Sequence, residues 1–195
     1  MFPSAPPSRC QRPSKASSGS AARMRYLADH DALTGLPNRM LFEDRLTHAL
    51  ADARRNKTQC ALIFVDLDHF KIINDTYGHA VGDSVLRAVA LRLSSCVRDS
   101  DTIGRVGGDE FVMLLPDIAG EKGAALVADK ARLALADGMV VEGHSISVSG
   151  SMGIAIYPQH GRTLSDLTNS ADTAMYEAKA NGRDTVRVFG KAPPA

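Results

Sequence analysis

The stretch from Ala61 to Val65 constrains the fold more than any other part of the sequence, because every residue in it is apolar. A short, continuous apolar run that contains β-branched residues is typical of a strand covered on both faces, whereas a half-exposed strand alternates. The run ends at Asp66, so a carboxylate is expected where the strand ends. The rest of the chain must therefore supply elements that cover both sides of this strand.

The neighbouring segments predict a mixed sheet. Residues 101–106 and 110–115 are expected to form a hairpin around Gly107 and Gly108. Because a hairpin adds antiparallel strands, we predict an α/β fold of the α+β two-layer type, with helices packed against a mixed central sheet, rather than a purely parallel doubly wound sheet. The other expected elements are helices at 38–57, 81–97, 123–135 and 164–180, and strands at 144–157 and 185–189.

Length and composition predict one folded domain without a bulk charge preference. Residues 1–22 are rich in Pro and Ser, so we expect a disordered tail before a domain at 23–195. The 23 Lys and Arg residues nearly balance the 22 Asp and Glu residues, which gives no reason to expect nucleic-acid binding or membrane insertion. The cysteines at 10, 60 and 96 follow neither a disulfide nor a metal pattern and are expected to be buried or unreactive. A soluble protein of the reducing cytoplasm is expected.

Three acidic residues have the chemistry of a metal site. Asp66 follows the central strand, and Asp109 and Glu110 occupy the turn of the expected hairpin. If the hairpin neighbours that strand, the carboxylates form a cluster that favours a divalent cation, and an oxygen-only ligand set suits Mg²⁺ completed by phosphate oxygens. The alternative is that these acids are solvated turn residues. Gly107 and Gly108 permit positive φ and a close approach by phosphates, but a turn alone would also use glycine.

A phosphate site needs another signal, because the sequence contains neither a Walker A string nor a Gly-x-Gly. Residues 68–71 are expected to start a short helix after the strand, where free N–H groups attract phosphate and Lys71 adds a positive charge. Lys179 and Arg183, at the end of the last long helix, are candidates for the same phosphates. Cations at that position also compensate the helix dipole, which is the alternative interpretation.

Several longer motifs occur in a fixed order along the chain. Residues 107–111 read GGDEF, residues 31–39 read DALTGLPNR, and DLDHFKIIND at 66–75 runs into GHAVGD at 78–83. Later come SMGIA at 151–155 and ADTAMYEAKANGR at 171–183. With these motifs, residues 29–189 resemble the catalytic domain of the GGDEF-type diguanylate cyclases. The departures are slight, such as Asp184 where Asn is common.

The resemblance implies a nucleotidyl-cyclase or palm-like fold that binds one GTP. It implies a homodimer in which each 3′-hydroxyl attacks the α-phosphate of the other GTP, so that cyclic di-GMP and two pyrophosphates form. Mg²⁺ or Mn²⁺ is implied to bind Asp66, the carbonyl of Leu67 and Asp109. Asp109 or Glu110 is implied to help deprotonate the 3′-hydroxyl, and Lys71 to neutralise charge on the phosphates.

The resemblance also implies how the base is read. A carboxylate at Asp83, with Asn74 beside it, accepts hydrogen bonds from guanine but faces a lone pair of adenine, and an unsatisfied buried edge costs roughly 1 to 3 kcal/mol. The chain is therefore expected to bind GTP in preference to ATP. The substrate-binding residues implied in this way are Phe70, Asn74, His79, Asp83, Gly107, Gly108, Lys179 and Arg183.

Two further expectations concern regulation. Arg98 and Asp101 resemble the Arg-x-x-Asp product-binding inhibitory site of the family, although an exposed ion pair at a helix end would give the same pattern. The unaltered catalytic positions favour a working cyclase. The alternatives are a catalytically silent domain that binds GTP or cyclic di-GMP and acts through a protein partner, and a truncated regulatory fragment that dimerises too weakly to react.

Overall fold

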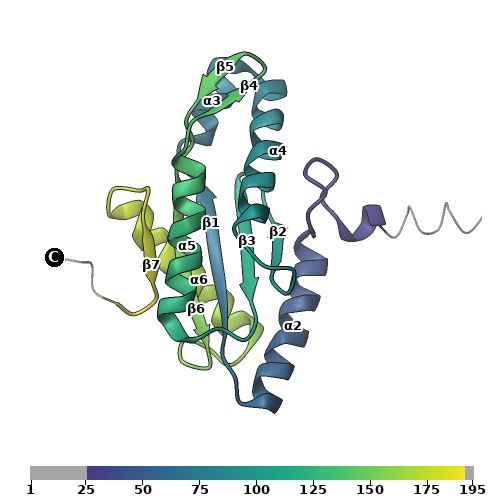
Figure 1. Ribbon diagram of the computed structural model, residues 1–195, viewed down its shortest axis with the longest axis vertical. Coiled ribbons are helices and arrows are strands. Elements are labelled where there is room, and N and C mark those ends of the chain that lie inside the picture. The colour runs from purple at the N-terminus through teal and green to yellow at the C-terminus, as the bar shows by residue number, and fades with distance from the viewer. Residues whose placement is uncertain (1–25, 192–195) are drawn as a thin grey trace, which may run out of the picture.

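The computed structural model describes residues 26–191, so the predicted disordered tail at 1–22 lies outside the described residues. Helices and strands alternate along the chain, as Figure 1 shows. The elements are α2 (Arg39–Asn56), β1 (Cys60–Leu67), α3 (Phe70–Tyr77), α4 (His79–Ser95), β2 (Thr102–Arg105), β3 (Glu110–Leu115), α5 (Gly120–Ala136), β4 (Met139–Val141), β5 (His144–Ile146), β6 (Gly150–Tyr157), α6 (Leu164–Ala180) and β7 (Val186–Val188).

A five-stranded sheet in the order β2-β3-β1-β6-β7 forms the centre of the domain. The pairs β2–β3, β3–β1 and β1–β6 are antiparallel, and β6–β7 is parallel. The predicted mixed sheet is confirmed. A separate two-stranded hairpin, β4–β5, lies with α3 beyond the end of the sheet toward which β1 runs (Figure 1).

The central strand β1 is buried along its whole length, as its apolar run predicted. Ile63 and Val65 pack into one cluster with α4 and α5, while Leu62 and Phe64 pack into a second cluster with α2 and α6. In Figure 1, α4 and α5 lie in front of the sheet and α6 behind it. Both faces of β1 are therefore covered by helices.

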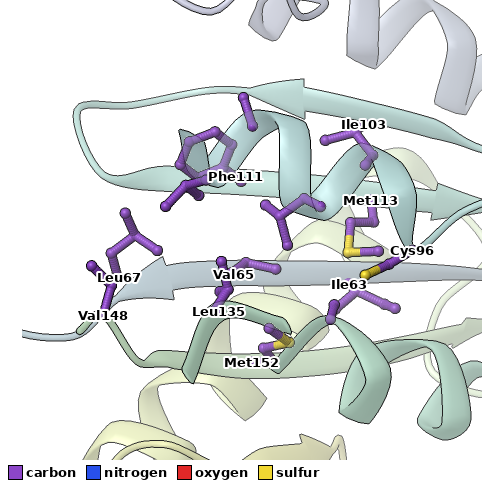
Figure 2. Close-up of a cluster of buried hydrophobic side chains, with 14 of the residues drawn as sticks. Ile63, Val65, Leu67, Cys96, Ile103, Phe111, Met113, Leu135, Val148 and Met152 are labelled. Atoms are coloured by element: carbon purple, nitrogen blue, oxygen red, sulfur yellow. The ribbon is translucent and has the colours of Figure 1, made fainter. Parts of the chain in front are cut away.

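The first cluster is the larger one, and Figure 2 shows its apolar side chains filling the space between strands and helices. Met113 and Met152, from the strands on either side of β1, are fully buried there. Each such side chain contributes roughly 1.5 to 3 kcal/mol through burial. Cys96 belongs to this cluster and Cys60 to the second. Both are free and buried, as predicted, and burial raises the pKa of the Cys60 thiol to about 11.

One predicted strand is divided in the structure. The expected strand at 144–157 becomes β5, which pairs only with β4, and β6, which pairs with β1 and β7. The alternating sequence pattern covers β5 and the connecting residues 147–149, whereas all of β6 is buried between helices. The prediction of a single strand was wrong because the alternating pattern of residues 144–149 was extended into β6, whose residues are all buried. Strand β4 was not predicted.

The predicted helices are present, with shifted ends. Helix α4 begins at His79 rather than Val81, and α5 begins at Gly120 rather than Gly123. Helix α6 begins with a capping box, in which the Thr163 hydroxyl accepts from the N–H of Asp166 and the Asp166 carboxylate accepts from the N–H of Thr163. None of the helices within residues 26–191 combines the length and the apolar character that crossing a membrane requires.

Candidate nucleotide and metal site

The site begins where β1 ends. The sheet register pairs Asp66 with Glu110, and the N–H of Leu67 donates to the carbonyl oxygen of Asp109 over 3.2 Å. The prediction that the hairpin lies beside the central strand β1 is therefore confirmed. Among residues 26–191, however, no group of three or more His, Cys, Asp or Glu side chains is arranged to hold a metal ion. The three acids are close enough for Asp109 and Glu110 to raise the pKa of Asp66, but they do not form a three-carboxylate metal group, and the ligand set of two carboxylates and the Leu67 carbonyl stays a prediction.

The side chain of Glu110 is turned toward Gly107 in the hairpin. A Cβ atom at Gly107 would lie 2.3 Å from Glu110 Oε2, so this carboxylate turns back over the turn, and only glycine leaves it room. A Cβ atom at Gly108 would meet nothing within 4 Å, which leaves its backbone open to a ligand. Neither glycine has a positive φ, so the backbone freedom that the sequence suggested is not used.

Asp66 is buried and paired. Its Oδ2 lies 2.7 Å from Lys179 Nζ, and only 11% of its side chain is exposed. Burial raises the pKa of Asp66 above its ordinary value and outweighs the ion pair with Lys179, while the charges of Asp109 and Glu110 raise the pKa further. Lys179 therefore contacts Asp66 and does more than compensate a helix dipole. A hard divalent cation fits the chemistry of this donor set, because all of its atoms are oxygens and the negative charges of Asp109 and Glu110 act on Asp66.

A cleft of about 320 Å³ adjoins these acids. It lies between α3, α4 and the β2–β3 turn, and it brings together most of the predicted catalytic and substrate-binding residues. Leu86 and Arg105 also line it and were not predicted to do so. The lining residues are Phe70, Lys71, Asn74, His79, Asp83, Leu86, Arg105, Gly108 and Asp109.

The part of the cleft farther along α3 is shaped by two glycines. Gly78 joins α3 to α4 with a φ of 85°. Gly82 lies on α4, where a Cβ atom would lie only 1.9 Å from Asn74 Oδ1. The missing side chain at Gly82 therefore lets Asn74 lie flat against α4, close to Asp83. His79 is the exposed first residue of α4 and not a loop residue.

The start of α3 has the predicted properties of a phosphate site. His69 adopts a left-handed conformation with φ 58°, and no side chain caps the N–H groups of the helix. Lys71, in the first turn, is exposed at the cleft. The uncapped N–H groups and the ammonium group both favour an anion.

The hairpin turn is held by the segment that precedes α2. Arg105 donates to the carbonyl oxygen of Gly108 over 2.7 Å and pairs with Asp31 over 2.9 Å. Arg39 donates to the carbonyl oxygen of Val106 over 3.0 Å. Sequence reasoning missed this support, because a pairing between such distant residues leaves no local signal.

The remaining predicted residues lie outside the cleft. Gly107 lines a neighbouring cavity, and Arg183 follows α6, where it is exposed and its N–H donates to the carbonyl oxygen of Ala178 over 3.2 Å. Arg98 and Asp101 line a small cavity of about 60 Å³ near the start of α5. The N–H of Arg98 donates to Asp101 Oδ2 over 2.9 Å, and the two side chains form no ion pair within the described residues.

Comparison with known families and relatives gives a consistent result. The family described as "Diguanylate cyclase, GGDEF domain" matches residues 28–185. Diguanylate cyclase TpbB of Pseudomonas aeruginosa is 44% identical over 168 residues, which cover 86% of this chain and 39% of the relative. Cyclic di-GMP phosphodiesterase PdeR of Escherichia coli is 40% identical over 170 residues, covering 86% of this chain and 25% of the relative. The chain thus spans less than half the length of these relatives.

Solved structures show the same architecture. The crystal structure of the TpbB GGDEF domain has a TM-score of 0.79 at 42% identity and covers 82% of this chain and 99% of that one. The coiled coil and GGDEF domain of DgcB from Caulobacter crescentus, solved with cyclic di-GMP, has a TM-score of 0.82 at 29% identity and covers 89% of this chain and 92% of that one. The α+β palm-like fold is therefore shared with these domains.

Proposed function

Because this chain belongs to the GGDEF-domain diguanylate cyclase family, we propose that it condenses two GTP molecules into cyclic di-GMP and two pyrophosphates. One observation carries the proposal: Asn74 and Asp83 line the same cleft as Lys71 and Asp109. The first pair suits a guanine base and the second a charged triphosphate.

The base end favours guanine over adenine. The Asp83 carboxylate accepts hydrogen bonds from the ring N–H and the amino group of guanine, and Asn74, held against Gly82, reads the same base. Adenine turns a lone pair toward a carboxylate in this place, which leaves both groups unsatisfied at a cost of roughly 1 to 3 kcal/mol. His79 and Phe70 line the pocket around the base.

The acids at the end of β1 would hold the metal. Asp66, the Leu67 carbonyl and Asp109 are the residues that would bind Mg²⁺, or Mn²⁺ in its place. The bound ion would polarise the phosphate and lower the pKa of the attacking hydroxyl. Lys179 offsets part of the negative charge of these acids through its ion pair with Asp66 at 2.7 Å.

The cleft supplies the remaining chemistry by positioning and charge. Asp109, or Glu110 after its carboxylate leaves the turn, accepts the proton of the 3′-hydroxyl. Lys71 and the uncapped N–H groups of α3 stabilise negative charge on the phosphates, with Lys179 and Arg183 approaching from the end of α6. Each new P–O bond replaces one bond to a leaving pyrophosphate, so no covalent enzyme intermediate is required.

The product requires two chains. One cleft holds one GTP, whereas cyclic di-GMP contains two phosphodiester bonds formed by reciprocal attack. Two copies must therefore face each other as a homodimer, and the rate depends on their association. Arg98 and Asp101 would bind the product at a separate place and give feedback inhibition, which the DgcB complex with cyclic di-GMP makes a reasonable expectation.

A silent effector is the second candidate, because PdeR, which aligns with this chain, is named only as a phosphodiesterase. The two functions are distinguished by incubating purified protein with GTP and Mg²⁺ over a range of protein concentrations and separating the nucleotides by chromatography. A working cyclase gives cyclic di-GMP at a rate that rises faster than linearly with protein concentration.

Two variants control this experiment. Asp109→Ala removes a proposed ligand and should abolish product. Asp52→Ala removes an exposed acid of α2, which pairs with Arg55, and should leave the rate unchanged. GTP binding without product in the unmodified protein would refute the cyclase and support the effector.

A further inference from the structure

The segment after α6 has a backbone that requires support. Gly182, Arg183 and Asp184 are consecutive residues with positive φ, at 101°, 63° and 42°. Glycine adopts this region freely, whereas residues with a Cβ atom adopt it at an energetic cost and persist there only where neighbouring groups hold them. All three residues are exposed, so packing does not supply that support.

Asp68 supplies it from inside the domain. This side chain is buried, with 6% of the residue exposed, and it lies just beyond the end of β1. Its Oδ2 accepts from the N–H of Asp184 over 3.0 Å and from Ser149 Oγ over 2.8 Å, while Oδ1 accepts from Ser151 Oγ over 2.7 Å. Three donors from different parts of the chain hold this buried carboxylate in place, because each hydrogen bond that is lost must be replaced to offset the cost of burial.

A second contact holds the same segment from α5. Arg132 Nη1 pairs with Asp184 Oδ1 over 3.0 Å, and this pair lies at the surface. The backbone of Asp184 is thus held by Asp68 and its side chain by Arg132. The residue between Gly182 and Asp184 is Arg183, the cation that the proposed function assigns to the phosphates.

We propose that Asp68 is a positioning residue that fixes the left-handed segment 182–184 and so holds Arg183 on the phosphate side of the site. This inference rests on the proposed function for the identity of the ligand. Both oxygens of Asp68 accept hydrogen bonds from groups of the fold, so the role that we assign to Asp68 is to position the segment and not to bind the substrate. Asp68 lies two residues after Asp66, so the same stretch of chain carries the proposed metal ligand and the residue that holds the Arg183 segment.

Two substitutions at Asp68 separate positioning from general stability. Asp68→Asn keeps an oxygen for the N–H of Asp184, and its amide can donate to Ser151, whose hydroxyl can rotate to accept. Asp68→Ala removes every acceptor. Thr163→Ala, which removes a helix cap at the other end of α6, controls for a loss of stability that leaves the segment in place.

The first measurement is amide hydrogen exchange of the nucleotide-free protein. In Asp68→Ala the amides of 183–185 should exchange on the order of tenfold faster, while those of β1 stay unchanged, and Asp68→Asn should restore most of the protection. Unchanged exchange in Asp68→Ala would overturn the proposal, whatever the activity. If that variant does not fold, Ser149→Ala combined with Arg132→Ala should loosen the segment in the same direction, and failure to do so would equally overturn it.

The second measurement is steady-state turnover of GTP. Asp68→Ala should raise KM for GTP by roughly fivefold or more with a smaller change in kcat, Asp68→Asn should largely reverse the increase, and Thr163→Ala should not reproduce it. An unaltered KM with a loosened segment would refute the link to Arg183. An unmodified protein that turns over no GTP would instead refute the proposed function, while the exchange measurement would still decide whether Asp68 holds the segment.

Discussion

Gly82 offers a substitution that should separate folding from nucleotide binding. It lies inside α4 with an ordinary helical backbone, so a residue with a side chain meets no conformational barrier there. A Cβ atom would lie 1.9 Å from Asn74 Oδ1 and 3.5 Å from Phe70 Cζ. The only serious clash is with the end of a flexible side chain, which can rotate away.

The two consequences of Gly82→Ala have opposite signs. Alanine is favoured over glycine in a helix interior by about 0.8 to 1 kcal/mol, so the free energy of unfolding should stay unchanged or rise by up to about 1 kcal/mol. Asn74 must leave its place beside Asp83, and the loss of one hydrogen bond to guanine, about 0.5 to 1.5 kcal/mol, should raise KM for GTP about 2- to 13-fold.

Urea denaturation and steady-state kinetics measure the two effects separately. Gly123→Ala is the matched control, because its Cβ atom would meet only Ala119 at 3.9 Å and lies on α5, outside the nucleotide cleft. It should gain the same helix propensity without a change in KM. Gly123 lines the cavity of Arg98 and Asp101, so initial rates are compared before product accumulates. In an Asn74→Ala background, Gly82→Ala should have no further effect on KM. An unchanged KM in the single variant, or an equal increase in both backgrounds, would refute the proposed role of Asn74.

Three further predictions concern stability. Thr163→Ala should lower the free energy of unfolding by about 1 kcal/mol, measured by urea denaturation, because the capping box is lost. Burial raises the pKa of Asp31, but hydrogen bonds from Thr34 and Arg105 outweigh it and lower the pKa below 3.8. The stability lost in Asp31→Asn, about 1 kcal/mol, should therefore be constant above about pH 5 and vanish as the pH falls through the folded-state pKa, and a constant loss in acid would contradict this. Arg187 is buried and its Nε has no partner among the described residues, so Arg187→Met should raise the free energy of unfolding by about 1 kcal/mol.

Most of the sheet could be predicted because its signals are local. The apolar run of β1 required cover on both faces, and the glycines at 107 and 108 marked the hairpin that makes the sheet mixed. The division of residues 144–157 was missed for a physical reason. The short edge strand β5 and the central strand β6 follow each other after three residues, and the burial of β6 comes from helices that its own sequence does not reveal.

The sequence predicted which residues belong to the site, but it did not predict how their side chains are arranged. Motif order placed Asn74, Asp83 and Asp109 together, and they share a cleft. The direction of the Glu110 carboxylate and the ion pair between Asp66 and Lys179 depend on side-chain conformations. No spacing in the sequence encodes these contacts, because they join elements through space.

The two ends of the cleft depend on different parts of the fold. Asp66 lies near the end of β1 and Asp109 directly precedes β3, so their separation is determined by the β1–β3 register. Asn74 and Asp83 lie on helices that begin beyond the sheet, and their position depends on the turn at Gly78 and on close packing at Gly82. Substitutions in the core change how much of the protein is folded, and they do not change the cleft of the folded molecules. They should therefore leave KM for GTP unchanged. Changes at 78–82 should alter KM while the sheet stays intact, so base recognition and metal binding can vary independently on one fold.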